Sequence, residues 1–245
     1  MSGHSKWATT KRAKAIIDAK RSSAFTKLSN NITIAAKEGG GDPTTNFKLR
    51  LAMDKARQFN MPKDNIERAV KRGTGELGGA TVEEVMYGAL LPHSVAVIIK
   101  CLTDNKNRTL NEVKILLQKN NAQLTDLNSI AWQFENRGVI HAKPQNPIHQ
   151  LADKTQEELE LAIIDAGAED FHQDEDEIII YTNPKELQLV KEKLEIAGLA
   201  IDSADLEMVP KEKVSLEGES LEKIIKIFDL IDELSDLSDY YTNLE

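Results

Sequence analysis

The first third of the chain carries apolar residues at helical spacing. Two stripes recur at intervals of three and four residues: Phe25, Leu28, Ile32 and Ala35, then Leu49, Met53 and Ala56. The glycine run 39–41 ends the first helix. The second ends before Pro62, because a residue that precedes proline is pushed out of the α region. A short helix then begins near Pro62, with Asp64 and Glu67 as a candidate capping pair and Gly73 as its C-terminal stop.

The opening stretch, residues 6–22, also predicts a helix, but its polar and apolar residues are distributed differently. Its apolar seam is narrow: Ala13, Ile16 and Ile17. The opposite face carries Lys11, Lys14, Asp18 and Arg21, with Arg12 and Lys20 beside them. A helix with so little apolar surface is marginally stable alone. We therefore expect it to dock on its neighbours or to be held by a partner.

After Gly79 the pattern changes to that of an α/β region. Residues 95–102 are typical of a buried strand, 110–117 of an amphipathic helix, and 129–134 alternate as a strand. The pattern then predicts a strand at 138–142, a helix at 155–166, a hairpin formed by 169–172 and 177–182, a helix at 184–197 and a strand at 201–209. This βαββαβ order is that of the ferredoxin-like fold. The tail, a helix at 221–234 and a short strand at 240–241, has no partner of its own and must pack on an earlier segment.

Length and composition limit the class of protein. The chain has 245 residues, 40% of them hydrophobic, which favours two or three domains. It holds no run of about eighteen apolar residues that would span a membrane, and its start lacks the apolar core of a secretory signal. The single cysteine, Cys101, excludes an internal disulfide. We expect a cytoplasmic protein.

The net charge of −9 conceals a strong division of charge along the chain. Residues 1–75 hold 16 Lys and Arg against 6 Asp and Glu, a net charge of +10. Residues 76–245 hold 15 against 34, a net charge of −19. A basic block points to a polyanionic partner, and an acidic remainder limits indiscriminate binding. The alternative is a solvated helical surface that happens to be rich in lysine.

The usual catalytic and cofactor motifs are missing or misplaced. Residues 73–78 match G-x-G-x-x-G, but a helix precedes the motif and a strand follows it, the reverse of a dinucleotide site, so we interpret it as a domain linker. The five histidines are scattered, and no cluster suits zinc. Cys101 lies inside an apolar strand and is expected to be an inert thiol. The loop 103–109 joins a buried strand to a helix. Asn107 or Asp104 is expected to cap the helix, and the loop is expected to cap, to bind a ligand, or both.

Several short segments together resemble the YebC family. They are GHSKW at 3–7, DAKR at 18–21, FTK at 25–27, AAKEGGGDP at 35–43, LRL at 49–51, NMPKDNIERA at 60–69, KRGTGE at 71–76 and CLTDN at 101–105. The resemblance covers the whole length, and its most specific motifs lie in the first 76 residues. A mitochondrial relative in this family is the translational activator of cytochrome c oxidase subunit I.

The resemblance implies an α+β protein of three domains. A helical nucleic-acid-binding domain would occupy residues 1–76. A middle α/β domain would occupy 80–135 and be completed by 211–245, with a ferredoxin-like α/β domain at 136–210 inserted into it. Both α/β domains are expected to be of the ferredoxin-like kind. This arrangement would supply the partner that the tail lacks.

The resemblance also implies a function without catalysis. The family is commonly labelled as DNA-binding transcriptional regulators, and some members act on ribosomes, including relief of stalling at proline runs. We therefore expect a nucleic-acid-binding regulator, with a ribosome-associated factor that binds ribosomal RNA as the alternative. No enzymatic activity, cofactor, metal, membrane or small-molecule substrate is expected.

The candidate contacts to nucleic acid are mostly cations, which would meet phosphates. Trp7 would stack on an unpaired base or anchor its helix. The predicted set is Lys6, Trp7, Lys11, Arg12, Lys14, Lys20, Arg21, Lys27, Arg50, Lys55, Arg57, Lys63, Arg68, Lys71, Arg72, Asn105, Lys106 and Arg108.

One segment departs from the family pattern. Relatives carry a glycine-rich turn before the second strand, whereas this chain has Leu91, Pro92, His93 and Ser94 there. Residues other than glycine adopt positive φ angles only at a cost. We expect a stiffer turn, which leaves open whatever role the flexible turn has in relatives.

Overall fold

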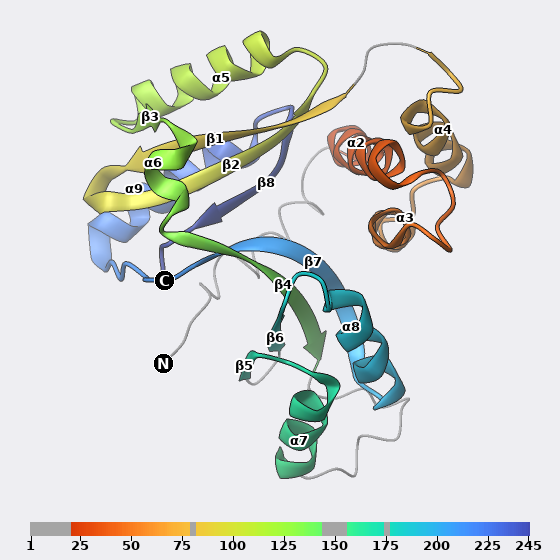
Figure 1. Cartoon of the computed structure of the whole chain (residues 1–245). Coiled ribbons are helices and arrows are strands. Elements are labelled where there is room, and N and C mark those ends of the chain that lie inside the picture. Colours follow the sequence, from red (N-terminus) through yellow and green to blue (C-terminus); the bar gives the residue numbers. More distant parts are fainter. Residues whose placement is uncertain (1–20, 79–81, 144–155, 174–176) are drawn as a thin grey trace. The chain divides into compact units, whose positions relative to one another are not determined.

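The computed structural model describes residues 21–78, 82–143, 156–173 and 177–245. Its N-terminal part is helical, as predicted, with α2 (Arg21–Gly39), α3 (Phe47–Gln58) and α4 (Lys63–Gly73). α2 packs against both α3 and α4 (Figure 1). Their apolar stripes meet in one core, in which Ile32, Leu49 and Ala56 are inaccessible to solvent. The opening helix expected at 6–22 lies outside the described residues except for its last two, which instead begin α2.

The C-terminus of α4 is closed by Gly75 and not by Gly73. Gly75 has a φ of 84°, in the left-handed region that favours glycine. Its N–H donates to the carbonyl of Arg72 (3.2 Å), and the N–H of Glu76 donates to the carbonyl of Lys71 (2.9 Å). This pair of bonds is the Schellman motif. The helix therefore ends at Gly73, as predicted, but the glycine that closes its last turn is Gly75.

Gly73 has a different role, which is to let α4 approach α2 closely. A Cβ atom at Gly73 would lie 2.4 Å from the carbonyl oxygen of Thr33 and 2.7 Å from Cβ of Ala36. Both atoms belong to α2, so the two backbones pass too near each other for any side chain at this position. The glycine thus sets the distance between the helices.

The N-terminus of α4 lacks the expected capping pair. Pro62 occupies the N-cap position, and no side chain there accepts a hydrogen bond from the helix. Asp64 lies in the first turn, where a carboxylate interacts favourably with the helix dipole. Glu67 instead faces Lys63, with 3.5 Å between Nζ and Oε1. The helix therefore lacks the two reciprocal hydrogen bonds of a capping box. It has instead the Asp64 carboxylate near the positive end of the helix dipole and an exposed ion pair between Lys63 and Glu67.

The first sheet has the strand order β3-β1-β2-β8, where β1 is Glu83–Leu91, β2 is Val95–Thr103, β3 is Gln123–Thr125 and β8 is Leu237–Thr242. β2 is the buried strand that the sequence predicts, and only Lys100 within it is partly exposed. The predicted amphipathic helix is present as α5 (Lys106–Lys119). Its buried residues Val113 and Leu117 join the core cluster formed by β1 and β2.

The C-terminal tail supplies both an edge strand and a helix to this sheet. β8 pairs antiparallel with β2, from Val97 opposite Thr242 to Cys101 opposite Leu237. α9 (Gly218–Asp232) buries Ile224, Ile227, Phe228 and Ile231 in the same cluster as α5. The Phe228 ring stacks on the Tyr240 ring of β8, with 5.1 Å between their centroids. The tail thus finds its partner in a strand more than 130 residues earlier in the chain.

The strand predicted at 129–134 is wrong. Residues 127–131 form the short helix α6 (Leu127–Ala131), and the next strand, β4 (Phe134–Lys143), begins only at Phe134. Asp126 caps α6, because its Oδ1 accepts a hydrogen bond from the N–H of Asn128 at 2.8 Å. The alternation of polar and apolar residues at 129–134 is short and therefore a weak signal for a strand. The cap that Asp126 provides favours a helix instead.

The turn between β1 and β2 holds two residues with left-handed backbones. His93 and Ser94 both have a φ of 63°. These angles are costly for residues other than glycine, so the turn contains backbone strain.

We expect Ser94→Gly to raise the free energy of unfolding by up to about 1 kcal/mol. The variant relieves about 1–2 kcal/mol of backbone strain, which exceeds the free-energy cost of the added conformational entropy of the unfolded chain. Urea unfolding measures the change. Ser129→Gly in helix α6 is the control and should destabilise the protein. A loss of stability in both variants would contradict the inference that the backbone of Ser94 is strained.

The second sheet has the order β5-β6-β4-β7, where β5 is Asp170–Gln173, β6 is Ile178–Thr182 and β7 is Ala200–Pro210. β6 pairs antiparallel with both β4 and β5. The helices α7 (Gln156–Ala166) and α8 (Leu187–Ile196) contact each other and bury Ile163 and Leu194. Every element predicted between 138 and 209 is present. Contacts group residues 136–209 as one compact unit and the rest of the described chain as another.

A histidine lies between two carboxylates in the second sheet. His141 on β4 has its Nδ1 2.7 Å from Oε1 of Glu177, and its Nε2 lies 3.8 Å from Oε1 of Glu207 on β7. Burial opposes protonation of this imidazole, but the two carboxylates outweigh it and raise the pKa of His141 to about 9. The ring is therefore charged at neutral pH.

This histidine predicts a pH dependence of stability. The folded-state pKa of about 9 exceeds the ordinary value of 6.5, so the stabilisation is complete below about pH 6.5 and is lost as the pH rises through about 9. The shift corresponds to about 3 kcal/mol. Urea unfolding of the wild type should show this decline in the free energy of unfolding, and His141→Gln should lack it. Parallel pH profiles for the two proteins would contradict the charged histidine.

Candidate nucleic-acid interface

Helix α4 presents three cations on one side. Arg68, Lys71 and Arg72 stand at i, i+3 and i+4, which places them on neighbouring positions of one face. All three are exposed, and within the described part of the chain their side chains form no ion pair or hydrogen bond. Lys63 is exposed on the same helix but pairs with Glu67. Cations without carboxylate partners are available to an anionic ligand.

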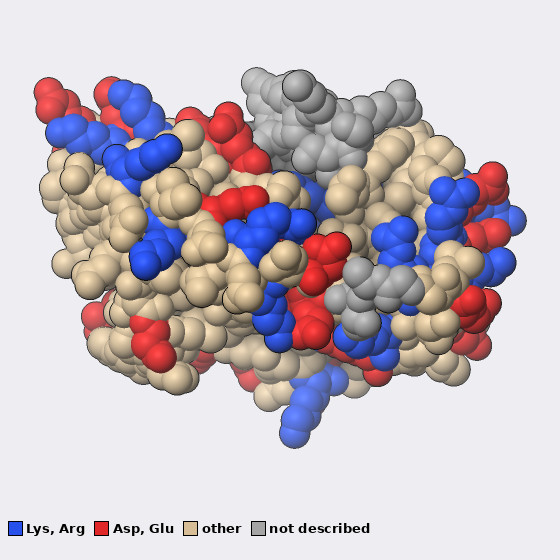
Figure 2. Space-filling model, turned by 90° about the horizontal axis from the view of Figure 1, so that it is seen from above, with Lys and Arg blue, Asp and Glu red and all other residues tan. Residues whose placement is uncertain are grey.

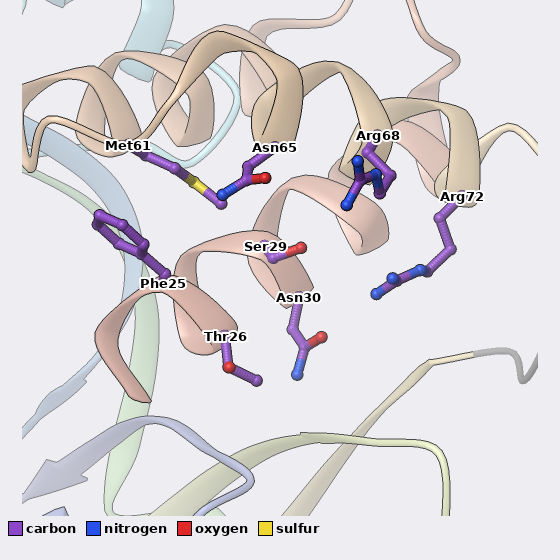
Figure 3. A pocket seen from close by; sticks show the side chains of 8 residues that line it. All are labelled: Phe25, Thr26, Ser29, Asn30, Met61, Asn65, Arg68 and Arg72. Atoms are coloured by element: carbon purple, nitrogen blue, oxygen red, sulfur yellow. The ribbon is translucent and has the colours of Figure 1, made fainter. Parts of the chain in front are cut away.

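A groove between α2 and α4 adjoins two of these cations. Its volume is about 240 Å³. Eight side chains line it, four from α2 and four from the segment 61–72: Phe25, Thr26, Ser29 and Asn30, then Met61, Asn65, Arg68 and Arg72. Figure 3 shows Phe25 and Met61 at one end of the groove and the two arginines at the other. The groove therefore has an apolar end and a cationic end.

Sequence reasoning found the arginines of this groove but missed three other side chains that line it. Phe25, Asn30 and Asn65 were not predicted as contacts. Two of them lie in segments that carry the family resemblance, 25–27 and 60–69. That signal does not say which residues of α2 meet which residues of α4, because the pairing depends on how closely the helices pack.

The predicted cations of α3 have contacts within the protein. The Arg50 guanidinium lies over the Phe47 ring, 5.5 Å from its centroid. Arg57 is exposed and forms an ion pair with Asp54, at 2.7 Å between Nη1 and Oδ1. Lys55 is half-buried. Exposed pairs of this kind contribute little to stability, so Arg57 can exchange its carboxylate for a phosphate at little cost.

Lys27 is directed toward the protein itself. It is half-buried, and its Nζ donates a hydrogen bond to the carbonyl oxygen of Asp232 at the end of α9, at 3.0 Å. Burial lowers the pKa of Lys27, with Asp232 acting in the opposite direction. We therefore leave Lys27 out of the proposed interface, because it already satisfies a helix C-terminus.

The loop 103–109 caps and braces α5. The Oδ1 atom of Asn105 accepts a hydrogen bond from the N–H of Arg108 at 3.1 Å, which is an N-cap. Lys106 pairs with Glu83. Arg108 pairs with Asp236 at 2.9 Å. The loop therefore caps the helix as predicted, but the capping residue is Asn105 and not Asn107 or Asp104. Binding of a ligand by this loop stays a prediction.

Asp236 joins this loop to the C-terminal segment. Its Oδ2 accepts hydrogen bonds from Thr109 (2.6 Å), Thr103 (2.9 Å) and Arg108 (2.9 Å). Burial opposes ionisation of Asp236, but these bonds outweigh it and lower its pKa. Sequence reasoning did not find this network, because Asp236 is more than 125 residues from its three partners.

The remaining predicted contacts are not described. Lys6, Trp7, Lys11, Arg12, Lys14 and Lys20 lie outside the described residues. Arg21 begins α2. Figure 2 shows one face of the molecule, on which Lys and Arg side chains lie among Asp and Glu side chains. The coloured Lys and Arg residues of this face, which belong to the described part of the chain, do not form one continuous patch.

Metal binding and thiol chemistry have no support in the part of the chain that the structure describes. No group of three or more His, Cys, Asp or Glu side chains there could hold a metal ion. Cys101 is buried, and burial raises the pKa of its thiol to about 12. None of the helices described is both long and apolar enough to cross a membrane.

Comparison with known proteins identifies the family. Residues 5–76 match the family model of the TACO1/YebC protein N-terminal domain, and residues 82–244 match that of the TACO1/YebC second and third domain. The chain belongs to the TACO1/YebC family. This confirms the resemblance found in the sequence. The gap between the two models, residues 77–81, contains Gly78 and Gly79.

Relatives of the TACO1/YebC family match this chain over its whole length. A "probable transcriptional regulatory protein" of Caldanaerobacter subterraneus is 45% identical over 100% of this chain and 98% of its own. A protein of Thermotoga petrophila with the same description is 46% identical over 100% of this chain and 94% of its own. The crystal structure of a conserved hypothetical protein from Aquifex aeolicus is similar with a TM-score of 0.83 and 38% identity, over 94% of this chain and 92% of that one.

Proposed function

We propose that this TACO1/YebC protein is a non-enzymatic regulator of gene expression that binds nucleic acid through its N-terminal helical region. The observation that carries the proposal is the face of α4, where Arg68, Lys71 and Arg72 are exposed without carboxylate partners among the described residues. They belong to a segment with a net charge of +10. A duplex or a single strand offers the phosphates that such a face would bind.

DNA is the first candidate target and would make the protein a transcriptional regulator. The names of its relatives support this choice, since both are described as probable transcriptional regulatory proteins. Ribosomal RNA is the second candidate, in a ribosome-associated factor that relieves stalling. Its support is the family resemblance, since a mitochondrial relative is a translational activator, and the matching family model carries the name TACO1/YebC. For either role we propose a cytoplasmic location.

The proposed domain layout follows the expected one. Residues 1–76 would form the helical domain, 80–135 with 211–245 the middle domain, and 136–210 the inserted domain. The inserted domain would be ferredoxin-like, which is supported by its element order β4-α7-β5-β6-α8-β7 and its strand order. The pairing of β8 with β2 supports the return of the chain to the middle domain.

Crosslinking in living cells tests the function directly. The tagged protein is crosslinked with ultraviolet light, and the attached nucleic acid is sequenced. Recovery of defined chromosomal sites would support the transcriptional regulator, and recovery of ribosomal RNA would support the translation factor. Recovery of neither above the level of an untagged control would contradict the proposal. Sedimentation with ribosomes gives an independent measure of the second role.

A further inference from the structure

We propose that the groove between α2 and α4 holds a single unpaired nucleotide, with its phosphate on Arg68 and Arg72 and its base against Phe25. The inference rests on the proposed nucleic-acid binding and adds the kind of target, which is a single strand, a loop or a flipped base. The side chains that line the groove come from α2 and from the segment 61–72, and they border one space of about 240 Å³.

The charge of the groove suits a phosphate. None of the side chains that line it is Asp or Glu. Arg68 and Arg72 stand one helical turn apart and extend toward α2 at the same end of the groove (Figure 3). A guanidinium group offers several N–H donors in a fork that matches phosphate oxygens. An anion placed here therefore meets two cations and no opposing carboxylate from the groove itself.

The opposite end of the groove suits a base. Phe25 and Met61 provide apolar surface there, and Phe25 also packs on the helical core, which limits its motion. Unpaired bases in nucleic-acid complexes stack on aromatic side chains, and amide side chains bond to base edges. Asn30 and Asn65 line the same groove and supply amide donors and acceptors. An acidic peptide would use the arginines but not this apolar end.

The size of the groove selects one nucleotide over a duplex. Pockets for drug-sized ligands measure about 300–1,000 Å³, and this groove is somewhat smaller. A paired base is stacked between its neighbours and cannot reach a space between two helices without unpairing. We therefore expect the protein to prefer single-stranded or looped nucleic acid to a perfect duplex of the same sequence.

The test compares probes and matched variants by fluorescence anisotropy. The probes are a labelled single-stranded RNA of about 12 nucleotides, the DNA strand of the same sequence, and each of the corresponding duplexes. Phe25→Leu removes the ring but keeps apolar volume, and Phe59→Leu is its control, since Phe59 packs on the same core outside the groove. Arg68→Gln with Arg72→Gln removes the phosphate contacts, and the exposed Lys48→Gln is a control for charge in the same domain.

The expected results separate this inference from the proposed function. Phe25→Leu should weaken single-strand binding about 10-fold and leave duplex binding unchanged. The double arginine variant should reduce the salt slope on single strands by about 1.4. Binding of duplex in preference to single strands, or equal losses in Phe25→Leu and Phe59→Leu, would overturn the inference while the proposed function stands. Absence of binding to every probe would overturn both.

A photocrosslink locates the base independently of affinity. A single 5-iodouridine replaces successive positions of the RNA probe, and the crosslinked peptide is identified by mass spectrometry. We expect one position to crosslink to the peptide that contains Phe25, and Phe25→Leu to abolish that product. Crosslinks confined to other peptides would place the base elsewhere and refute the inference. Displacement of the RNA by polyglutamate, but not by unlabelled single strands, would point to an acidic peptide and also refute it.

Discussion

Truncation after Val214 is expected to unfold the middle α/β domain. The deleted segment contains α9 and β8, whose side chains Ile224, Phe228 and Ile231 are inaccessible to solvent in the core. Burial of one large apolar side chain contributes about 1.5–3 kcal/mol, so the four buried residues of α9 account for roughly 6–12 kcal/mol. A whole domain is stable by only about 5–15 kcal/mol. The truncation also strips β2 of its pairing with β8 and leaves a buried strand as an open edge.

Circular dichroism and thermal melting of the truncated chain measure this effect. A milder version keeps the chain intact: Phe228→Ala should lower the free energy of unfolding by about 3–5 kcal/mol, because it leaves a cavity beside Tyr240. Leu230→Ala is the control on the same helix, since Leu230 is 38% exposed and should cost much less. A truncated protein that melts at the wild-type temperature would show that the tail is dispensable.

Reversal of three charges on α4 is expected to abolish tight binding of nucleic acid. Arg68→Glu, Lys71→Glu and Arg72→Glu together replace three candidate phosphate contacts by repulsive charges, and the affinity should fall on the order of 100-fold or more. If each cation meets one phosphate, the salt slope should decrease by about 2.7 on duplex or about 2.1 on single strands. The fold should be retained, since all three side chains are exposed.

The control for this experiment makes the same change of net charge on α5 and α9, which belong to the same compact unit as α4. Lys114→Glu, Lys119→Glu and Lys226→Glu alter exposed lysines of α5 and α9. They should change affinity only through long-range electrostatics, which salt screens. Filter binding across a range of salt concentrations gives both affinity and slope. Equal losses in the two triple variants would show that net charge, and not the face of α4, controls binding.

A second triple variant tests the opening helix that the sequence predicts at residues 6–22. Lys11→Glu, Lys14→Glu and Arg21→Glu are expected to weaken binding through the same electrostatic effect, with a smaller salt slope. Two other predicted contacts, Lys106 and Arg108, are paired with Glu83 and Asp236. Their replacement should therefore affect the stability of α5 more than the affinity. An α4 variant with unchanged affinity would assign the contact to the opening helix.

Local patterns in the sequence were sufficient for most of the secondary structure. Helical spacing of apolar residues predicted α2 and α3, and a continuous apolar run predicted β2. The division of charge and the short family segments predicted a basic helical region and a regulatory family, and the family is confirmed. These features are readable because periodicity, charge and motif letters lie within a few residues of one another.

Tertiary structure decided the features that depend on distant residues. Gly73 is required because α2 passes 2.4 Å from where its Cβ would lie, and nothing near Gly73 in the sequence indicates that neighbour. Arg108 resembles a binding residue until Asp236, 128 positions later, is brought against it. Likewise, Phe25 and Arg72 form one groove only because two helices pack side by side. The physical reason is that contacts between distant segments depend on how the whole core packs. A local segment determines only the spacing of its own apolar residues and the caps of its own helix.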